Sequence, residues 1–213
     1  MIGPPGSGKG TQAVRIAQWR SVPHISTGDI LRAAVRAESP LGRKVAAVMA
    51  AGGLVDDAII TELVEERLRA DDASRGFVLD GFPRSLAQAE ALDRMRPADS
   101  LIVVLIEVPS EAIVRRLSSR RVCDGCGITQ SVSHESAGRE PCPYCGGNLV
   151  RRPDDNPDTI RRRLSAYADV SDPVVAYYRG RRGFGVIDGR QHAERVTADL
   201  QAHIGRALNN GGS

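Results

Sequence analysis

The chain has 213 residues, of which 41% are hydrophobic, 26% charged and 4% aromatic, and its formal net charge is +3. This length and composition fit one globular domain with an aliphatic core. The sequence contains no apolar run near the roughly 18 residues of a membrane-spanning helix, and its start does not resemble a secretory signal. We therefore expect a cytoplasmic protein without a membrane partner. The mild basic charge suits either phosphate or nucleic acid and does not choose between them.

Helices and strands are predicted to alternate along the chain. Apolar spacing, cap residues and turn residues predict helices at 10–20, 29–37, 41–52, 56–70, 86–95, 110–120, 158–170, 174–180 and 193–208. Short apolar runs predict strands at 22–26, 76–81, 100–108 and 184–189. The alternation is typical of an α/β fold with a doubly wound parallel sheet, whose ligands lie at the carboxyl ends of the strands.

Residues 3–9 read GPPGSGK, which fits the GxxxxGK pattern of a phosphate-binding loop. Backbone N–H groups of such a loop, with the N-terminus of the next helix, surround phosphate oxygens. Lys9 is one of only two lysines among 29 basic residues, which favours a specific role for its slim, compact charge. The alternative interpretation is a glycine-rich turn that holds no ligand.

Only Met1 and Ile2 precede this loop, where a central strand normally leads into it. We therefore expect the first strand of the sheet to be truncated. A truncated strand loses ladder hydrogen bonds and anchors the loop less well. A weakly catalytic nucleotide binder is accordingly one alternative function for the chain.

Residues 121–150 interrupt the alternation of helices and strands and contain all four cysteines, in the pattern CxxC, fifteen residues, CxxC. Two such pairs fit a closed tetrahedral site for structural zinc, and iron accepts the same ligands. Redox-active cysteine pairs are the other interpretation, but they do not require a second pair at this spacing. The predicted metal ligands are Cys123, Cys126, Cys142 and Cys145.

Several motifs together carry a resemblance to a known family. They are GPPGSGKGTQA from Gly3, STGDILR at 26–32, DGFPRS at 80–85 followed by Gln88, and arginine pairs on both sides of the cysteine module. The chain resembles the adenylate kinases, in their bacterial long-lid, zinc-binding form, from Gly3 to about Leu208. The resemblance implies reversible phosphoryl transfer from ATP to AMP, giving two ADP, with Mg²⁺ and a structural Zn²⁺.

The resemblance also implies an organisation and a set of partners. It implies one P-loop kinase domain over 1–213, with a monophosphate-binding segment at 26–55 and a lid at 119–155. These two parts are expected to close over the substrates and exclude water. The implied partners are ATP and AMP, with no nucleic acid and no membrane, and the implied state is a monomer.

Residue roles follow from the same resemblance. The implied ATP-binding residues are Gly6, Ser7, Gly8, Lys9, Gly10, Thr11, Arg116, Arg120, Thr129, Gln130 and Gln191. The implied AMP-binding residues are Thr27, Arg32, Gly53, Leu54, Val55, Gly81, Phe82, Pro83, Arg84, Gln88, Arg152 and Arg163. Asp80 is expected to orient magnesium through water. The implied catalytic residues are Lys9, Arg84, Arg120, Arg152 and Arg163.

The chemistry independently favours an arginine-rich site. Transfer between two nucleotides brings two polyanions together, and the transition state spreads negative charge over equatorial oxygens. Cationic side chains then supply positioning and electrostatic stabilisation.

Three positions differ from the family pattern. Ser85 replaces a usual threonine, Asp56 replaces a usual proline, and Gln130 lies near the ATP base where the family often has tyrosine. The last difference is expected to weaken stacking on adenine.

Two further functions are weighed against adenylate kinase. A kinase preferring UMP or CMP is the alternative within the class, but Thr27 and Gln88 resemble the adenine-selective version. A metal-ribbon module for nucleic acid is the alternative outside it. Such a module uses aromatic stacking platforms, and Tyr144 is the only aromatic residue of the cysteine module.

Overall fold

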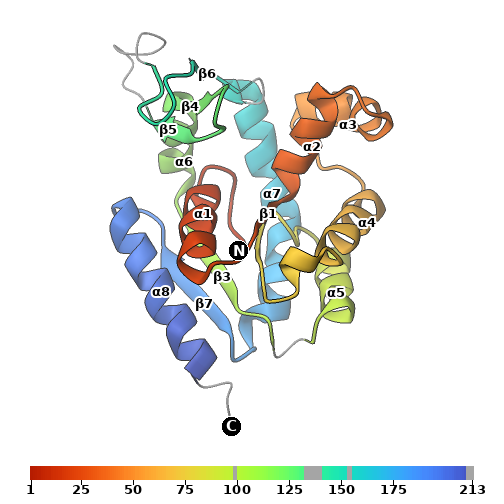
Figure 1. Ribbon diagram of the computed structural model, residues 1–213, viewed down its shortest axis with the longest axis vertical. Helices are drawn as coiled ribbons and strands as arrows, with labels where there is room; N and C mark the ends of the chain where they lie inside the picture. The colour runs from red at the N-terminus through yellow and green to blue at the C-terminus, as the bar shows by residue number, and fades with distance from the viewer. Residues whose placement is uncertain (98–99, 132–140, 153–154, 210–213) are drawn as a thin grey trace.

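The computed structural model describes residues 1–97, 100–131, 141–152 and 155–209 (Figure 1). Its helices are α1 (Lys9–Arg20), α2 (Thr27–Arg36), α3 (Pro40–Ala51), α4 (Asp57–Leu68), a 3₁₀ turn (Asp71–Ala73), α5 (Leu86–Met95), α6 (Ser110–Ser119), α7 (Pro157–Arg179) and α8 (Ala193–Asn209). Its strands are β1 (His24–Ser26), β2 (Val78–Asp80), β3 (Val103–Glu107), β4 (Arg120–Cys123), β5 (Thr129–Ser131), β6 (Leu149–Val150) and β7 (Phe184–Asp188). The predicted α/β class is confirmed.

The central sheet consists of two parallel pairs, β1 with β2 and β3 with β7. Met1 and Ile2 lie between the pairs. The backbone nitrogen of Ile2 donates to the Val104 carbonyl at 2.9 Å, and its carbonyl accepts from the Ile106 nitrogen at 3.0 Å. On the other side, the Met1 nitrogen donates to the Leu79 carbonyl at 2.7 Å. These two residues therefore occupy the position where the sequence predicts the truncated first strand.

Helices cover both faces of the β3 and β7 pair, as Figure 1 shows. Val104 and Ile106 of β3 point to one face and pack in a core with residues of α1 and α8. Val103 and Leu105 point to the other face and pack with residues of α5 and α7. This period of two is the alternation of a strand that is buried on both faces.

Helix α7 runs without a break through Pro173. The sequence predicted two helical stretches there, because proline usually interrupts a helix by removing a hydrogen bond. Buried residues on both sides of Pro173, Ser171 and Val174, belong to the same helix. Packing of its buried face therefore outweighs the local cost of the proline.

The cysteine module forms an antiparallel sheet in the order β5, β4, β6 and lies at one end of the molecule, next to the start of α7 in Figure 1. The parts of the predicted lid at 132–140 and 153–154 fall outside the described residues. A search of the described part of the chain for a helix long and apolar enough to span a membrane finds none.

Candidate functional site

A cleft of about 790 Å³ lies between the glycine loop, the segment of α2 and α3, and the cysteine module. The predicted nucleotide-binding residues all line this cleft except Phe82. Phe82 is fully buried and packs in a core with Ile25 and Leu79. The structure therefore brings together residues from distant stretches of the sequence, and it buries Phe82 in the core instead.

The glycine loop has the backbone geometry that its glycines predict. Gly3, Gly6 and Gly8 have φ values of 143°, 82° and 100°, a region that side chains disfavour. A Cβ on Gly6 would stand 2.8 Å from Leu117 of α6, so the loop packs closely on that helix. A Cβ on Gly8 would meet no atom within 4 Å, which shows that the inner side of the loop is open.

Helix α1 begins at Lys9, directly after this open loop. Gly8 is its N-cap, and none of the described side chains caps the helix. The N–H groups of its first turn therefore point toward the cleft, where the helix dipole favours an anion. The buried hydroxyl of Ser7 has no hydrogen-bond partner among the described residues. Together these donors form a site that suits phosphate oxygens.

Lys9 and Asp80 place opposite charges beside the loop. Burial lowers the pKa of Lys9 to about 8, and the Asp80 carboxylate partly opposes this effect. Burial would raise the pKa of Asp80, but His24, whose Nε2 is 3.8 Å from Asp80 Oδ2, and the Lys9 ammonium hold it at about 2. Asp80 is the last residue of β2, so its carboxylate lies at the carboxyl edge of the sheet. Its low pKa keeps it ionised, which makes it a suitable partner for hydrated magnesium.

Two of the predicted monophosphate-binding residues contact the carbonyl oxygen of Gly81. The Thr27 hydroxyl donates to this oxygen at 3.1 Å, and Arg84 Nε donates to it at 2.8 Å. Gly81 has φ of 83°, and a Cβ there would stand 2.9 Å from both side chains. Only glycine leaves room for this arrangement, which turns the Arg84 guanidinium into the cleft.

Gln88, in the first turn of α5, is 2% exposed and lines the cleft. Its Oε1 accepts from the Arg84 backbone nitrogen at 2.8 Å, and its Nε2 donates to Asp57 Oδ1 at 2.6 Å. Asp57 also lines the cleft, and the sequence analysis gave it no role. Its position at the start of α4 offered no motif that marks it.

Asp155 is a second residue that the sequence analysis missed. It is fully buried and binds Arg120 at two points, with Arg120 Nε 2.6 Å from Asp155 Oδ2. Arg163 Nη1 lies 3.5 Å from Asp155 Oδ1, and Arg151 donates to the Asp155 carbonyl at 2.7 Å. A single buried carboxylate thus organises two of the predicted catalytic arginines.

Three other predicted residues make polar contacts beside the cleft. Arg116 donates to the Gly189 carbonyl at 2.7 Å, joining α6 to the loop after β7. Gln191 donates to Asp199 at 3.0 Å. Arg32 pairs with Asp29 at 2.6 Å, and this pair is open to solvent.

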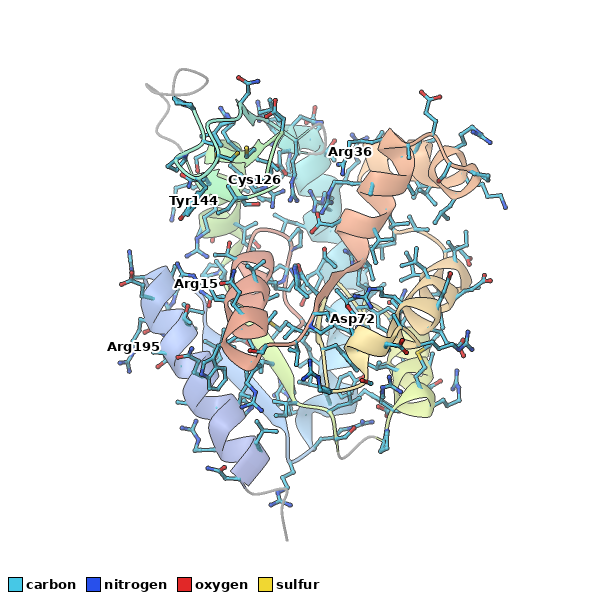
Figure 2. All side chains as sticks on the ribbon, viewed as in Figure 1. Arg15, Arg36, Asp72, Cys126, Tyr144 and Arg195 are labelled. Carbon is cyan, nitrogen blue, oxygen red and sulfur yellow. The ribbon has the colours of Figure 1, made fainter. Side chains whose placement is uncertain are left out.

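Arg152 lines the cleft on the side of the cysteine module, and its positive charge helps to lower the pKa of Asp29. Burial opposes this shift, and Arg32 contributes the largest lowering. Arg152, beside the cysteine module, and Asp29 of α2 are therefore close enough to interact electrostatically. Tyr144 of the cysteine module and Arg15 of α1 also line the cleft, and both are labelled in Figure 2.

The four cysteines satisfy the geometry of a metal site. Their Sγ atoms all lie within 4.8 Å of one another, and none is in a disulfide. The Sγ atoms of Cys123 and Cys145 are 3.3 Å apart, and those of Cys126 and Cys142 are 3.6 Å apart. A tetrahedron with Zn–S bonds of about 2.3 Å has S–S edges of about 3.8 Å, close to both distances. The donor set therefore fits zinc, and Figure 2 shows Cys126 in the cysteine module.

Comparison with known proteins agrees with this site. The family model described as adenylate kinase matches residues 1–182. An adenylate kinase of Syntrophotalea carbinolica is 43% identical over 214 residues, which cover 98% of each chain. An adenylate kinase of Lachnospira eligens is 42% identical over 209 residues, which cover 96% of this chain and 98% of the relative. The chain therefore belongs to the adenylate kinase family.

Proposed function

We propose that this protein transfers the γ-phosphoryl group of ATP to AMP and gives two ADP, in a reversible reaction. One observation carries the proposal: the phosphate-binding loop shares one cleft with a second cationic region, which contains the side-chain amide of Gln88. The positive charges of Arg84, Arg163 and Arg120 reach Lys9 and add to the lowering of its pKa, after the larger effect of burial. Cations from four elements therefore converge on one region.

This convergence suits direct transfer between two bound nucleotides. The loop and the first turn of α1 hold the donor phosphates through N–H groups, and Lys9 neutralises their charge. Arg32 and Arg84 hold the acceptor phosphate, with Gln88 beside the adenine edge. Arg120, Arg152 and Arg163 counter the charge that spreads over the equatorial oxygens in the transition state. These residues position the two nucleotides and stabilise the transition state, so no covalent intermediate on the protein is needed.

Two metal ions complete the proposed function. Magnesium, oriented through water by Asp80, supplies charge neutralisation on the donor phosphates when bound. Zinc, bound by Cys123, Cys126, Cys142 and Cys145, stabilises the lid, whose own apolar core is small. The types of these residues and their mutual placement support both assignments.

The segment 26–55 and the lid 119–155 are proposed to move over the substrates. The end of the first segment lies close to α7, since a Cβ on Gly52 would stand 2.8 Å from Thr159 and 3.1 Å from Arg163. Closure removes water, which would otherwise compete as the phosphoryl acceptor. We further propose that the protein lies in the cytoplasm, because a reducing compartment keeps the four metal-binding thiols reduced. The resemblance to the family supports a monomer.

A coupled assay for ADP tests this proposal. Zinc-loaded protein with MgATP is given AMP, CMP, UMP or GMP in separate reactions. Rapid turnover with AMP, and turnover at least about tenfold slower with each of the others, supports the proposal. Equal or faster turnover with UMP or CMP would assign the chain to the other branch of the class.

A further inference from the structure

We propose that Asp57 is a positioning residue that holds the Gln88 carboxamide in one orientation and so sets the selectivity for the base of the monophosphate. This inference rests on the proposed function, in which Gln88 lies against that base. Asp57 itself needs no contact with the substrate, since it acts through Gln88.

Gln88 is held by hydrogen bonds to both its side chain and its backbone. Gln88 Nε2 donates to Asp57 Oδ1 at 2.6 Å, and Gln88 Oε1 accepts from the Arg84 backbone nitrogen at 2.8 Å. The second Asp57 oxygen accepts from the Ser85 hydroxyl. Ser85 is also the N-cap of α5 and accepts from the Gln88 backbone nitrogen at 3.2 Å. The start of α4 is thereby joined to the start of α5 through the base-reading side chain.

The chemistry of these partners allows only one orientation of the amide. A carboxamide turned by 180° exchanges its oxygen and nitrogen with almost no change in shape, so packing alone does not select between the two states. A carboxylate only accepts hydrogen bonds, and a backbone N–H only donates. Asp57 therefore selects the NH₂ end, and Arg84 independently selects the oxygen end. Both contacts favour the same state.

The fixed amide keeps one free group at each end. The NH₂ group has two N–H donors and the oxygen has two lone pairs, so after these contacts one N–H and one lone pair are left. Gln88 can offer them in a fixed order to a base in the cleft. Adenine presents a ring-nitrogen acceptor beside an amino donor and matches one donor with one acceptor, whereas the Watson–Crick edge of guanine presents a ring N–H donor beside a carbonyl acceptor, the reverse arrangement. An amide that is free to turn accepts both bases.

Because Gln88 is buried, the orientation of its amide affects the selectivity for the base. At 2% exposure, its free groups have little access to bulk water, so a mismatched base leaves them unpaired. Sites built on such buried hydrogen bonds reject the wrong substrate far more strongly than apolar pockets do. The carboxylate of Asp57 thus acts on selectivity rather than on phosphoryl transfer itself.

Asp57→Asn is the direct test, because asparagine has the same shape but presents either a donor or an acceptor to Gln88. Asp56→Asn is the matched control. Asp56 is exposed, caps α4 by accepting from Ala58 at 2.9 Å, and does not line the cleft. Asparagine caps a helix as well as aspartate does. The two variants therefore make the same chemical change at adjacent positions.

The measured quantities are KM and kcat for AMP, the ratio of kcat/KM for AMP to that for GMP, and the melting temperature. For Asp57→Asn we expect KM for AMP to rise about tenfold or more, kcat to change less than about threefold, and the AMP to GMP ratio to fall about tenfold or more. Asp56→Asn should match the wild type in all four. A merely structural role for Asp57 would lower activity with both monophosphates equally, and an unchanged ratio would overturn the proposal.

Wild-type protein separates this test from a failure of the proposed function. If the wild type shows no preference for AMP, the proposed substrate is wrong and the role of Asp57 fails with it. If the wild type prefers AMP and Asp57→Asn keeps that preference, only the role of Asp57 is overturned. Should Asp57→Asn fold poorly, Asp57→Ser gives the same test, because a hydroxyl also donates or accepts. A retained AMP to GMP ratio in Asp57→Ser would likewise overturn the inference.

Discussion

Asp155, just before α7, holds Arg120, at the start of β4, through a two-point contact. The Asp155 carboxylate is fully buried and also lies 3.5 Å from Arg163. Such a pair fixes the direction of a guanidinium fork, which a free arginine reaches only at an entropic cost. The geometry of the transition-state arginines therefore depends on a residue that touches no nucleotide in the proposed mechanism.

Replacing Asp155 should uncouple the arginines from each other. Asp155→Asn keeps the volume but leaves two cations near a neutral buried group, so we expect kcat to fall about 100-fold and the free energy of unfolding to fall by about 3 kcal/mol. Steady-state kinetics and urea unfolding measure the two quantities. Asp158→Asn, in an exposed pair with Arg161, is the control and should change neither. Wild-type kcat in Asp155→Asn would contradict the role given to the pair.

The lowered pKa of Lys9 predicts a pH dependence of ATP binding. In the free protein, burial holds the Lys9 pKa at about 8. Bound phosphates favour the charged form, so binding raises this pKa and takes up a proton above that pH. MgATP affinity should therefore be constant below about pH 7 and fall about tenfold toward pH 9.5.

Titration calorimetry at several pH values checks this expectation. Lys9→Met should bind weakly and lose the pH dependence between pH 7 and 9.5. Lys44→Met, at an exposed position of α3, should keep the wild-type profile. A wild-type profile that stays flat through pH 9.5 would show that Lys9 is charged throughout.

Removal of zinc should unfold the lid before the rest of the protein. Leu149 and partly buried Ile128 are the main apolar side chains packed with the buried cysteines, so the metal supplies much of the stability of the lid. We expect Cys126→Ser to abolish stoichiometric zinc and to lower the melting temperature by roughly 6–12 °C, equivalent to about 3 kcal/mol. Metal analysis and calorimetry give both values. Chelated wild type should recover when zinc is restored, and full stability without metal would exclude a structural zinc.

Two glycines of the loop should differ in their tolerance of alanine. Both have positive φ, but a Cβ on Gly6 meets Leu117 at 2.8 Å whereas one on Gly8 meets nothing within 4 Å. Gly6→Ala combines backbone strain with overpacking and should lower the free energy of unfolding by about 3 kcal/mol. Gly8→Ala adds backbone strain without overpacking and should lower the free energy of unfolding by about 1 kcal/mol. Urea unfolding without nucleotide measures both, and equal losses would contradict the packing of Gly6.

The sequence predicted the fold class and most of the cleft because local signals carried them. The glycine loop, the residues around Gly81 and the cysteine pairs are contiguous motifs whose chemistry is readable from spacing. Asp57 and Asp155 had no such signal, since their roles arise from contacts across 31 and 35 positions of the chain. Only the folded chain brings these carboxylates to the amide and the guanidinium that they orient.

Other differences have equally physical reasons. Pro173 lies inside one continuous helix because tertiary packing of α7 overrides a local preference. Phe82 follows a binding motif, yet its size and apolarity place it in the core. Met1 bonds to β2 and Ile2 pairs with β3 through backbone hydrogen bonds, which no side-chain pattern encodes.

The most direct test of the central claim follows the phosphorus atoms of ATP and AMP together by NMR in the presence of the zinc-loaded protein and magnesium. The account predicts that ATP and AMP disappear at equal rates and that two ADP form for each ATP consumed, with almost no free phosphate. It also predicts that ADP alone regenerates ATP and AMP. Release of inorganic phosphate while AMP stays constant would contradict it, because the cleft would then pass the phosphoryl group to water.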